Sequence, residues 1–285
     1  MPLTGGLNNE GILLHQLGVE GGQGRPSQLI EKRTTRQQEA LLHQRLMLLQ
    51  QGDQSGDLLP RVYGVLPADH IWRLFLAYVP CPVAAPLDAT SAGQLLARLA
   101  FRFHCTMGLV HLQESPAVDA LLRRQCRRIA VAAADCEALN PDVIRDIADQ
   151  LAVRLASQKL VLAHNDLHWD NVRSANLNAP FCYQLIDLGG AGWNLAGAEF
   201  HTQMRQALMG ASGAPIWPHA INHYSELSGI APTHLKLAAL WYGLVRSAAV
   251  WKRVSPGGSN RRRQREKRLL TRLVSRLDHE LMVSD

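Results

Sequence analysis

Two stretches of the chain decide its fold: His164-Asn165-Asp166-Leu167-His168-Trp169-Asp170-Asn171-Val172 and, further on, Leu185-Ile186-Asp187-Leu188-Gly189. They place an acid, an amide and a second acid in order. Asp166 precedes Asn171 by five positions, and Asp187 follows sixteen positions later. A carboxylate can orient a hydroxyl group and accept its proton. Amide and carboxylate oxygens are ligands that suit magnesium. This combination indicates phosphoryl transfer.

The spacing from Asp166 to Asn171 matches the H-R-D-x-x-x-x-N loop of protein kinases, and Asp187 takes the place of the D-F-G acid. Short apolar runs at 159–163 and 181–186 predict two strands, with a turn at 176–180 between them. Such a hairpin would bring the three side chains to one rim. The alternative is a polar hairpin whose Asn and Asp residues only shape turns.

Several motifs resemble one family. His164-Asn165-Asp166-Leu167-His168 resembles the catalytic motif of the aminoglycoside phosphotransferase and choline/ethanolamine kinase superfamily, small-molecule kinases with a protein-kinase-like fold. Leu3 to Asn9 resembles its opening strand and nucleotide turn. Ala191-Gly192-Trp193-Asn194 and Gly197-Ala198-Glu199-Phe200 resemble the segment that follows the metal-binding Asp in choline and ethanolamine kinases.

The resemblance implies an α+β, bilobal fold. An N-terminal lobe over residues 1–80 would hold a small antiparallel sheet and one helix. A mostly helical lobe over 81–285 would carry the catalytic hairpin at 160–190 and a basic C-terminal helix. Residue patterns agree, since the first ninety residues favour strands around one helix, and later segments have helical periodicity. We expect that first helix over 35–51, with Thr34 or Thr35 as its N-cap.

The resemblance also implies an ATP site in the first lobe. Gly5 and Gly6, with Asn8, would let the backbone approach the phosphates. Lys32, on the third strand, would bind phosphate and pair with Glu39 on the following helix. Arg33 is the alternative cation, although alternation along a strand turns it to the opposite face. Backbone groups from Ala77 to Val79 would contact the adenine.

The implied roles are Asp166 as the catalytic base, with Asn171 and Asp187 as ligands of Mg2+. The expected reaction moves the γ-phosphate of ATP to a small-molecule hydroxyl, most plainly an amino alcohol of the choline or ethanolamine type, or thiamine. Trp193, Glu199, Trp241 and Tyr242 are candidates for the substrate site. Aminoglycoside or sugar kinases and a protein-kinase-like effector are the alternatives. Trp241 is equally compatible with a place in the core.

Composition narrows the remaining classes. Among 285 residues, 47% are hydrophobic, and the formal net charge is +6. Residues 252–276 carry a local +9, so the rest of the chain is slightly acidic. Apolar residues at helical spacing in this basic segment, such as Leu269 and Leu273, favour an amphipathic helix over a nucleic-acid site. Five scattered cysteines argue against a disulfide framework or zinc site, and no apolar run is long enough to span a membrane. We expect a cytoplasmic protein without a signal peptide.

Overall fold

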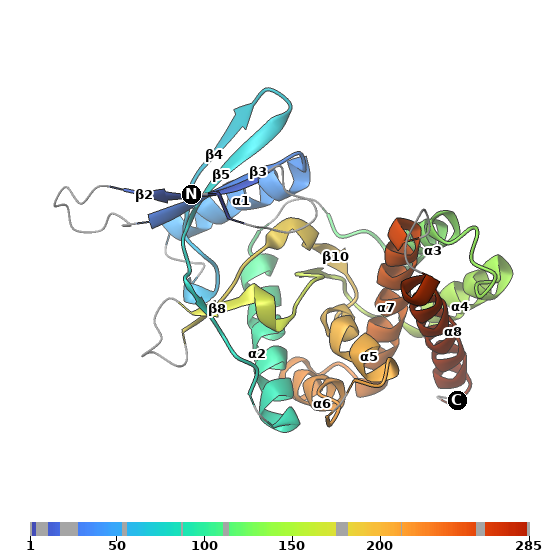
Figure 1. Ribbon diagram of the computed structural model, residues 1–285. Coiled ribbons are helices and arrows are strands. Elements are labelled where there is room, and N and C mark those ends of the chain that lie inside the picture. The colour runs from blue at the N-terminus through green and yellow to red at the C-terminus, as the bar shows by residue number, and fades with distance from the viewer. Residues whose placement is uncertain are drawn as a thin grey trace. The chain divides into compact units, whose positions relative to one another are not determined.

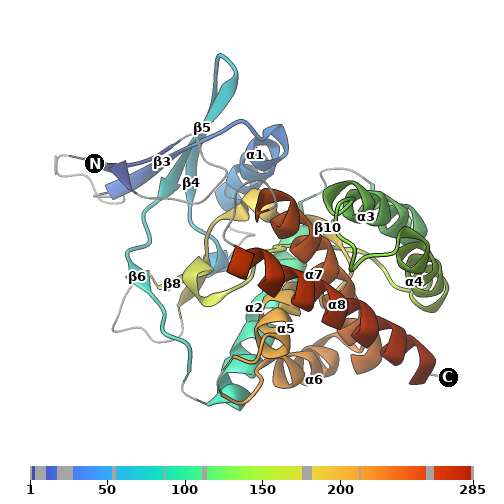
Figure 2. The ribbon, with the colours of Figure 1, turned by 45° about the vertical axis from the view of Figure 1, so that its right-hand side comes forward.

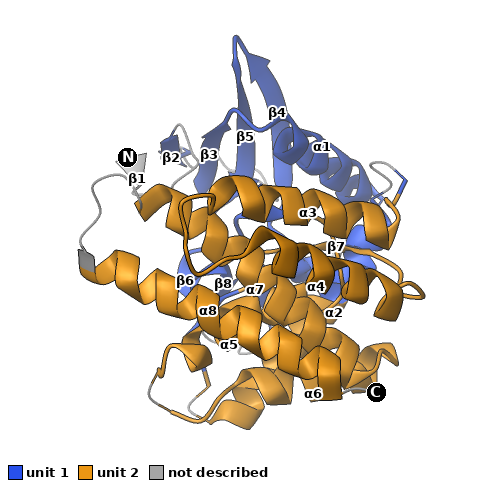
Figure 3. Cartoon of the chain, turned by 90° about the vertical axis from the view of Figure 1, so that its right-hand side faces the viewer, with its two compact units in different colours: residues 1–85, 102–114, 168–191 blue, residues 86–101, 115–167, 192–285 orange. Residues whose placement is uncertain are grey.

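The computed structural model describes residues 2–3, 11–17, 28–52, 56–86, 88–110, 114–174, 182–211, 213–254 and 260–283. The chain forms two compact units, which Figure 3 colours separately. Unit 1 comprises residues 1–85, 102–114 and 168–191, and unit 2 comprises residues 86–101, 115–167 and 192–285. The α+β class is confirmed, while the lobe boundary expected at residue 80 stays a prediction.

Unit 1 contains an antiparallel five-stranded sheet in the order β1-β2-β3-β5-β4. Its strands are β1 (Pro2–Leu3), β2 (Gly11–Gln16), β3 (Gln28–Thr34), β4 (Val62–Ala68) and β5 (Ile71–Ala77). β4 continues through Pro67 to Ala68, because it is an edge strand, where the missing N–H of proline breaks no ladder bond. The hairpin then closes through Asp69, whose φ of 52° is left-handed.

Helix α1 (Gln37–Gln51) packs against strands β3, β4 and β5, and Figure 1 shows it alongside them. Ala40, Leu42 and Leu46 supply its buried side. The predicted N-cap is wrong, because the helix begins after Arg36, which makes no side-chain cap bond. Thr34 instead accepts a hydrogen bond of 3.1 Å from the backbone N–H of Arg36, which tightens the turn from β3 into the helix.

A buried carboxylate, Glu31, ties neighbouring parts of the sheet together. Arg73 on β5 donates to it at 2.8 Å and 3.0 Å, Arg33 donates at 3.0 Å, and His15 lies 2.9 Å away. The bond from Arg73 contributes most to lowering the pKa of Glu31, which falls to about 2 although burial opposes the shift. Arg33 therefore shares the face of Glu31, opposite Lys32, as strand alternation predicts.

We expect the Glu31→Gln variant to unfold more easily at pH 7, by about 1–2 kcal/mol after allowing for screening of the partly exposed arginines. Because the folded-state pKa is depressed, the stabilisation is complete above about pH 4.5 and is lost as the pH falls towards 2. Urea denaturation at pH 7 and pH 3 measures the difference. It should shrink at pH 3, because the carboxyl is then protonated in the unfolded chain and still ionised in the folded one, so that proton uptake favours unfolding of the wild type. A difference independent of pH would contradict this.

Unit 2 is mainly helical, and the predicted helical segments are confirmed. The helices are α2 (Ala89–Gly108, which also enters unit 1), α3 (Val118–Ala132), α4 (Pro141–Arg154), α5 (His201–Leu208), α6 (Trp217–Ser228), α7 (Pro232–Val254) and α8 (Asn260–Val283). α7 packs against α3, α5, α6 and α8. Figure 2 shows α8 beside α7. No helix in the described ranges is long and apolar enough to cross a membrane.

The basic C-terminal segment is an amphipathic helix. Five leucines of α8 are at most 1% exposed: Leu269, Leu270, Leu273, Leu277 and Leu281. Each contributes about 1.5–3 kcal/mol on burial. Cations of α8 form ion pairs with the segment after α3, Arg263 with Asp135 at 3.1 Å and Lys267 with Glu137 at 2.8 Å. The apolar side of the helix is thus part of the core of unit 2.

The predicted catalytic hairpin is wrong in its pairing. β7 (Val161–Ala163) pairs with β10 (Gly192–Asn194) in unit 2, whereas β9 (Tyr183–Leu185) pairs with β8 (Val172–Ser174) in unit 1. β6 (Cys81–Pro82) completes the second of these sheets. The reason is β8, a three-residue strand that begins directly after the motif loop and pairs with β9 in place of β7.

Short 3-10 turns occur at Gly56–Leu58, Trp169–Asn171, Leu188–Gly190 and Ala198–Phe200.

Candidate active site

A buried ion cluster in unit 1 joins three of the predicted site residues. Lys32 Nζ lies 2.7 Å from Glu39 Oε1 and 2.6 Å from Asp187 Oδ1. The side chains of Lys32 and Glu39 are 6% and 2% exposed, whereas that of Asp187 is 39% exposed. The cluster therefore has two buried members and one acid that solvent reaches.

The electrostatics of the cluster keep its cation charged. Burial alone lowers the pKa of Lys32, but the charges of Glu39 and Asp187 and their hydrogen bonds outweigh it, so the pKa lies above its ordinary value. Burial lowers the pKa of the nearby His43, whose Nδ1 lies 2.8 Å from the carbonyl oxygen of Glu39. Lys32 thus stays an ammonium at neutral pH.

The local chain path explains how residues only seven positions apart can pair. β3 ends at Thr34 and α1 begins at Gln37, so Lys32 near the end of the strand faces Glu39 in the first turn of the helix. Asp187 arrives after β9 with a φ of 60°, a left-handed conformation that turns the chain into the 3-10 turn that follows. Arg36 donates to the carbonyl of Gly189 and ties this turn to the base of α1.

A cavity of about 410 Å3 in unit 1 opens onto the cluster. Lys32, Asn171 and Asp187 are among its polar lining residues. The stretch from Ala77 to Val79, predicted to contact adenine, also lines it, as does the neighbouring Pro80. Apolar side chains form much of the remaining wall: Ile12, Ile30, Leu46, Leu59, Leu76, Leu185, Ile186 and Leu188. A mostly apolar cleft with a few convergent charges is the usual form of a small-ligand site.

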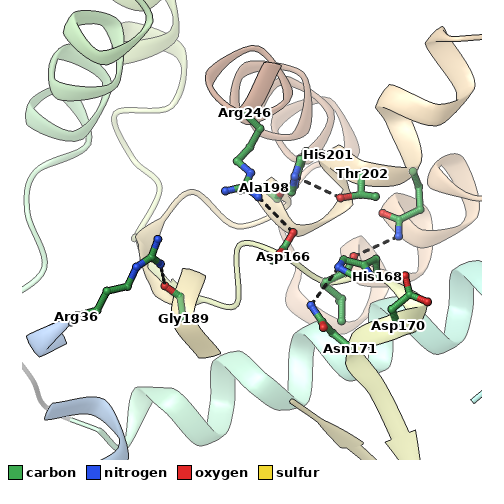
Figure 4. Close-up of polar contacts among 12 residues, drawn as sticks. Arg36, Asp166, His168, Asp170, Asn171, Gly189, Ala198, His201, Thr202 and Arg246 are labelled. Carbon is green, nitrogen blue, oxygen red and sulfur yellow. Dashed lines mark hydrogen bonds and ion pairs between the residues drawn. The ribbon is translucent and has the colours of Figure 1, made fainter. Parts of the chain in front are cut away.

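Asn171 is held in place by its own loop. Its backbone N–H donates to the carbonyl of His168 at 2.9 Å, and its backbone carbonyl accepts from Ile186 at 3.0 Å. Its side-chain Nδ2 lies 3.1 Å from His168 Nε2, as Figure 4 shows, which fixes the orientation of the amide. The bond from the backbone N–H of Ile186 holds Asn171 beside Ile186, the residue that precedes Asp187. An amide oxygen and a carboxylate that line one cavity are a donor set suited to Mg2+, which also keeps water ligands.

Asp166 belongs to unit 2, where it follows β7 and the buried residues His164 and Asn165. Asn165 has a φ of 63° and is one of the described non-glycine residues in the left-handed region. Its side chain accepts from Asn194 at 2.6 Å and donates to the carbonyl of Gly192 at 3.3 Å, across to β10. These bonds hold the backbone immediately before Asp166.

The hydrogen bonds continue into the helical core. Gln125 of α3 donates to Asn194 Oδ1 at 3.3 Å, and the indole N–H of Trp241 donates to Gln125 at 2.7 Å. Gly197 lets this part of the chain pass α7 closely, since its φ is 96° and a Cβ there would lie 2.6 Å from the carbonyl oxygen of Leu235. The loop before Asp166 is therefore anchored to both α3 and α7.

The backbone of Asn165 yields a stability prediction. We expect every replacement of Asn165 to lower the free energy of unfolding. The loss should be smallest for Asn165→Gly, larger for Asn165→Ala and largest for Asn165→Val, at about 2–4 kcal/mol. All three lose the side-chain bonds, but glycine accepts a positive φ without strain and a β-branched residue does not. Guanidinium denaturation of the three proteins checks the order. Equal losses would mean that the backbone conformation carries no strain.

The sequence did not point to Arg246, which lies beside Asp166. Its Nη2 is 3.4 Å from Asp166 Oδ1, and the two side chains are 33% and 32% exposed (Figure 4). Arg246 follows Tyr242 by four positions on α7, so it shares a helix face with a residue already predicted for the substrate site. The spacing of Tyr242 and Arg246 was the signal in the sequence that could have pointed to Arg246. It places both residues on one helix face, but it does not show that this face contacts the loop of Asp166.

Comparisons with solved structures place this architecture among known folds. A protein from Ralstonia eutropha JMP134, designated an aminoglycoside phosphotransferase, superposes with a TM-score of 0.65 at 11% identity, covering 99% of this chain and 92% of that one. A thermostable mutant of aminoglycoside phosphotransferase APH(4)-Ia, in ternary complex with ADP and hygromycin B, gives 0.60 at 9% identity, covering 96% and 92%. A protein from Haemophilus somnus 129PT, designated a fructosamine-3-kinase, gives 0.56 at 12% identity, covering 88% and 83%. The chain has the aminoglycoside phosphotransferase-like kinase fold. No protein-family model and no curated protein sequence matches the chain.

Within this aminoglycoside phosphotransferase-like fold, the predicted substrate residues have different environments. Trp241 is fully buried and Glu199 is 1% exposed, so Trp241 is the core anchor that its helical spacing also allowed. Tyr242 packs edge-on against the ring of His201, with centroids 5.0 Å apart. Burial raises the pKa of Tyr242, although Arg246 and Arg128 oppose the shift. Trp193 is partly exposed on β10.

The remaining predicted nucleotide residues, Gly5, Gly6 and Asn8, lie outside the described residues. Of the candidate functional residues, Lys32, Glu39, Asn171 and Asp187 belong to unit 1, whereas Asp166 and Arg246 belong to unit 2.

Proposed function

We propose that the protein is an ATP-dependent phosphotransferase that moves the γ-phosphate to a hydroxyl group of a small molecule. The observation that carries this proposal is the Lys32–Glu39–Asp187 cluster, with contacts of 2.6–2.7 Å, at a cavity of about 410 Å3. A lysine locked by a helical glutamate, beside a partly exposed acid, is the arrangement that phosphoryl-transfer enzymes use to hold ATP phosphates. The fold supports the same reading, since the APH(4)-Ia relative is in complex with ADP and hygromycin B.

Each residue has a task in this proposal. Lys32 would bind phosphate oxygens, with Glu39 fixing its position and charge. Asn171 and Asp187 would hold Mg2+, which when bound neutralises charge on the phosphates. Asp166 would orient the acceptor hydroxyl and take its proton late in transfer. The backbone from Ala77 to Val79 would bind the adenine edge.

The acceptor class is proposed from the motifs that follow Asp187 and from the fold. An amino alcohol of the choline or ethanolamine type, or thiamine, is favoured by the motifs that follow Asp187 and by the partly exposed Trp193. An aminoglycoside acceptor is supported equally well by the proteins that share the fold. We also propose a cytoplasmic location, since all five cysteines are free.

The test is incubation with γ-phosphate-labelled ATP, Mg2+ and a panel of amino alcohols, thiamine, aminoglycosides and sugars. Thin-layer separation of small products and a denaturing gel of an added protein mixture are then read in parallel. A labelled small molecule that depends on the enzyme supports the proposal. Label that appears only on protein would support the alternative, a protein-kinase-like effector. If no ATP is consumed in any reaction, the proposal is wrong.

A further inference from the structure

The part of unit 2 that solvent reaches around Asp166 is richer in cations than a site for a cationic acceptor should be. Asp166 and Arg246 are each about one-third exposed and lie 3.4 Å apart. Arg128 of α3 is exposed, and its charge acts on Tyr242 together with that of Arg246. Among these groups, solvent therefore reaches two guanidinium groups and one carboxylate.

Two of the residues expected to bind a cation, Glu199 and Trp241, lie deeper in the fold. Glu199 also acts electrostatically on Tyr242, but it is only 1% exposed. Trp241 is fully buried, and its indole N–H donates a hydrogen bond to Gln125. A quaternary or primary ammonium group beside Asp166 would have Arg246 as a like-charged neighbour, without direct access to Glu199 or to the Trp241 ring. Like charges at such short range oppose binding.

We propose that the acceptor carries an acidic group, a carboxylate or a phosphate, which Arg246 binds while the acceptor hydroxyl lies at Asp166. This inference rests on the proposed phosphotransferase function and narrows its acceptor class, because an acceptor that carries only a positive charge, such as choline, fits Arg246 less well than one that also carries an acidic group. A guanidinium group presents five donors, so Arg246 can bind an acidic group in bidentate fashion and still lie near Asp166. Arg128 supplies a second positive charge to the same neighbourhood.

The chemistry of the transfer is unchanged by the acidic group. The acceptor oxygen forms a bond to the γ-phosphorus of ATP, the bond from that phosphorus to the β–γ bridging oxygen breaks, and ADP leaves with the electron pair. The hydroxyl proton passes to Asp166 and then to solvent. Arg246 touches the acid group of the substrate and takes no part in the proton transfer. It is a specificity-determining residue.

Matched pairs of acceptors test this directly, because the two members of each pair differ in one acidic group. Suitable pairs are ethanolamine and serine, 3-aminopropanol and homoserine, and glucose and glucose 6-phosphate. For each compound, phosphorylated product and ADP are measured by mass spectrometry with wild type, Arg246→Ala and Arg246→Lys. Arg253→Ala provides a control at an exposed arginine of the same helix.

We expect the acidic member to be the better acceptor in at least one pair. Arg246→Ala should lower kcat/KM for that member by roughly 10- to 100-fold, mainly through KM, and should leave the neutral or cationic member within about threefold. Lysine should restore part of the loss, and the Arg253 control should match wild type.

Three results would overturn the inference. One is an equal loss for both members of a pair, which would assign Arg246 to the phosphoryl group or to Asp166. Another is preference for the non-acidic member throughout, and the third is ATP consumption that no acidic compound stimulates. If wild type consumes no ATP under any condition, the phosphotransferase proposal itself fails. That result is distinct from the other three.

Discussion

Replacement of Asp187 by alanine is expected to reduce phosphoryl transfer by at least about a thousandfold, since the loss of a metal ligand removes several kcal/mol of charge stabilisation from the transition state. The fold should survive, because Asp187 is partly exposed and Lys32 keeps its 2.7 Å contact with Glu39. Initial rates of ADP formation with an active acceptor measure the effect. Circular dichroism and the thermal midpoint establish that the variant is folded.

The control for this variant is Asp57→Ala, an exposed acid of the same unit that does not line the cavity. It should behave as wild type. Retention of more than a tenth of the wild-type rate by folded Asp187→Ala would contradict the assignment of Asp187 to the metal. The same variant should also lose the magnesium dependence of ATP binding in a calorimetric titration.

Asp166→Asn is expected to lower kcat by roughly a hundredfold to ten-thousandfold and to leave the dissociation constant of ATP unchanged. Asparagine keeps the size of the side chain and can still contact Arg246, but it cannot accept the hydroxyl proton. Asp166 is not among the residues that line the unit 1 cavity, so nucleotide binding should not depend on its charge. Single-turnover rates and ATP titrations of the same preparation separate the two quantities.

The opposite pattern would count against the proposed base. If Asp166→Asn weakened ATP binding and left the single-turnover rate of bound ATP intact, Asp166 would be a nucleotide residue. Asp170→Asn is a useful comparison within the same loop, because that carboxylate is 94% exposed and lies 3.5 Å from His168 Nδ1. We expect its effect to be much smaller than that of Asp166→Asn.

The parts of the site that the sequence predicted follow from local rules. Period-two alternation along β3 separates Lys32 from Arg33, and the structure places Arg33 with Glu31 on the other face. Helical periodicity located the helices of unit 2 and identified the apolar side of α8. The close pairing of Lys32 and Glu39 also follows from local geometry, since the turn between β3 and α1 is short.

The sequence predictions are wrong where contacts between distant parts of the chain determine the structure. The apolar run before the motif loop has the pattern of a strand, but a pattern does not specify a partner, and β7 pairs with β10 instead of β9. Thr34 has a side chain that can cap a helix, yet its bond to Arg36 serves the turn before α1. Trp241 and Tyr242 are adjacent on one helix, but Trp241 is completely buried and its indole N–H donates to Gln125 of α3.

The contact of Arg246 with Asp166 is likewise a long-range contact that the sequence does not show. Eighty positions separate the two residues, and no local motif connects them. The motif loop can predict what Asp166 does, because that depends on neighbouring residues of the loop. The acceptor class that we propose depends on Arg246 of α7, whose position beside Asp166 only the folded chain reveals.

The most direct measurement is a crystal structure of the protein with Mg2+ and a non-hydrolysable ATP analogue. We expect adenine in the unit 1 cavity against the backbone from Ala77 to Val79, with phosphate oxygens at Lys32. We also expect a metal ion coordinated by Asn171 and Asp187 together with water. Nucleotide bound elsewhere, or a metal that contacts neither Asn171 nor Asp187, would contradict the proposed function.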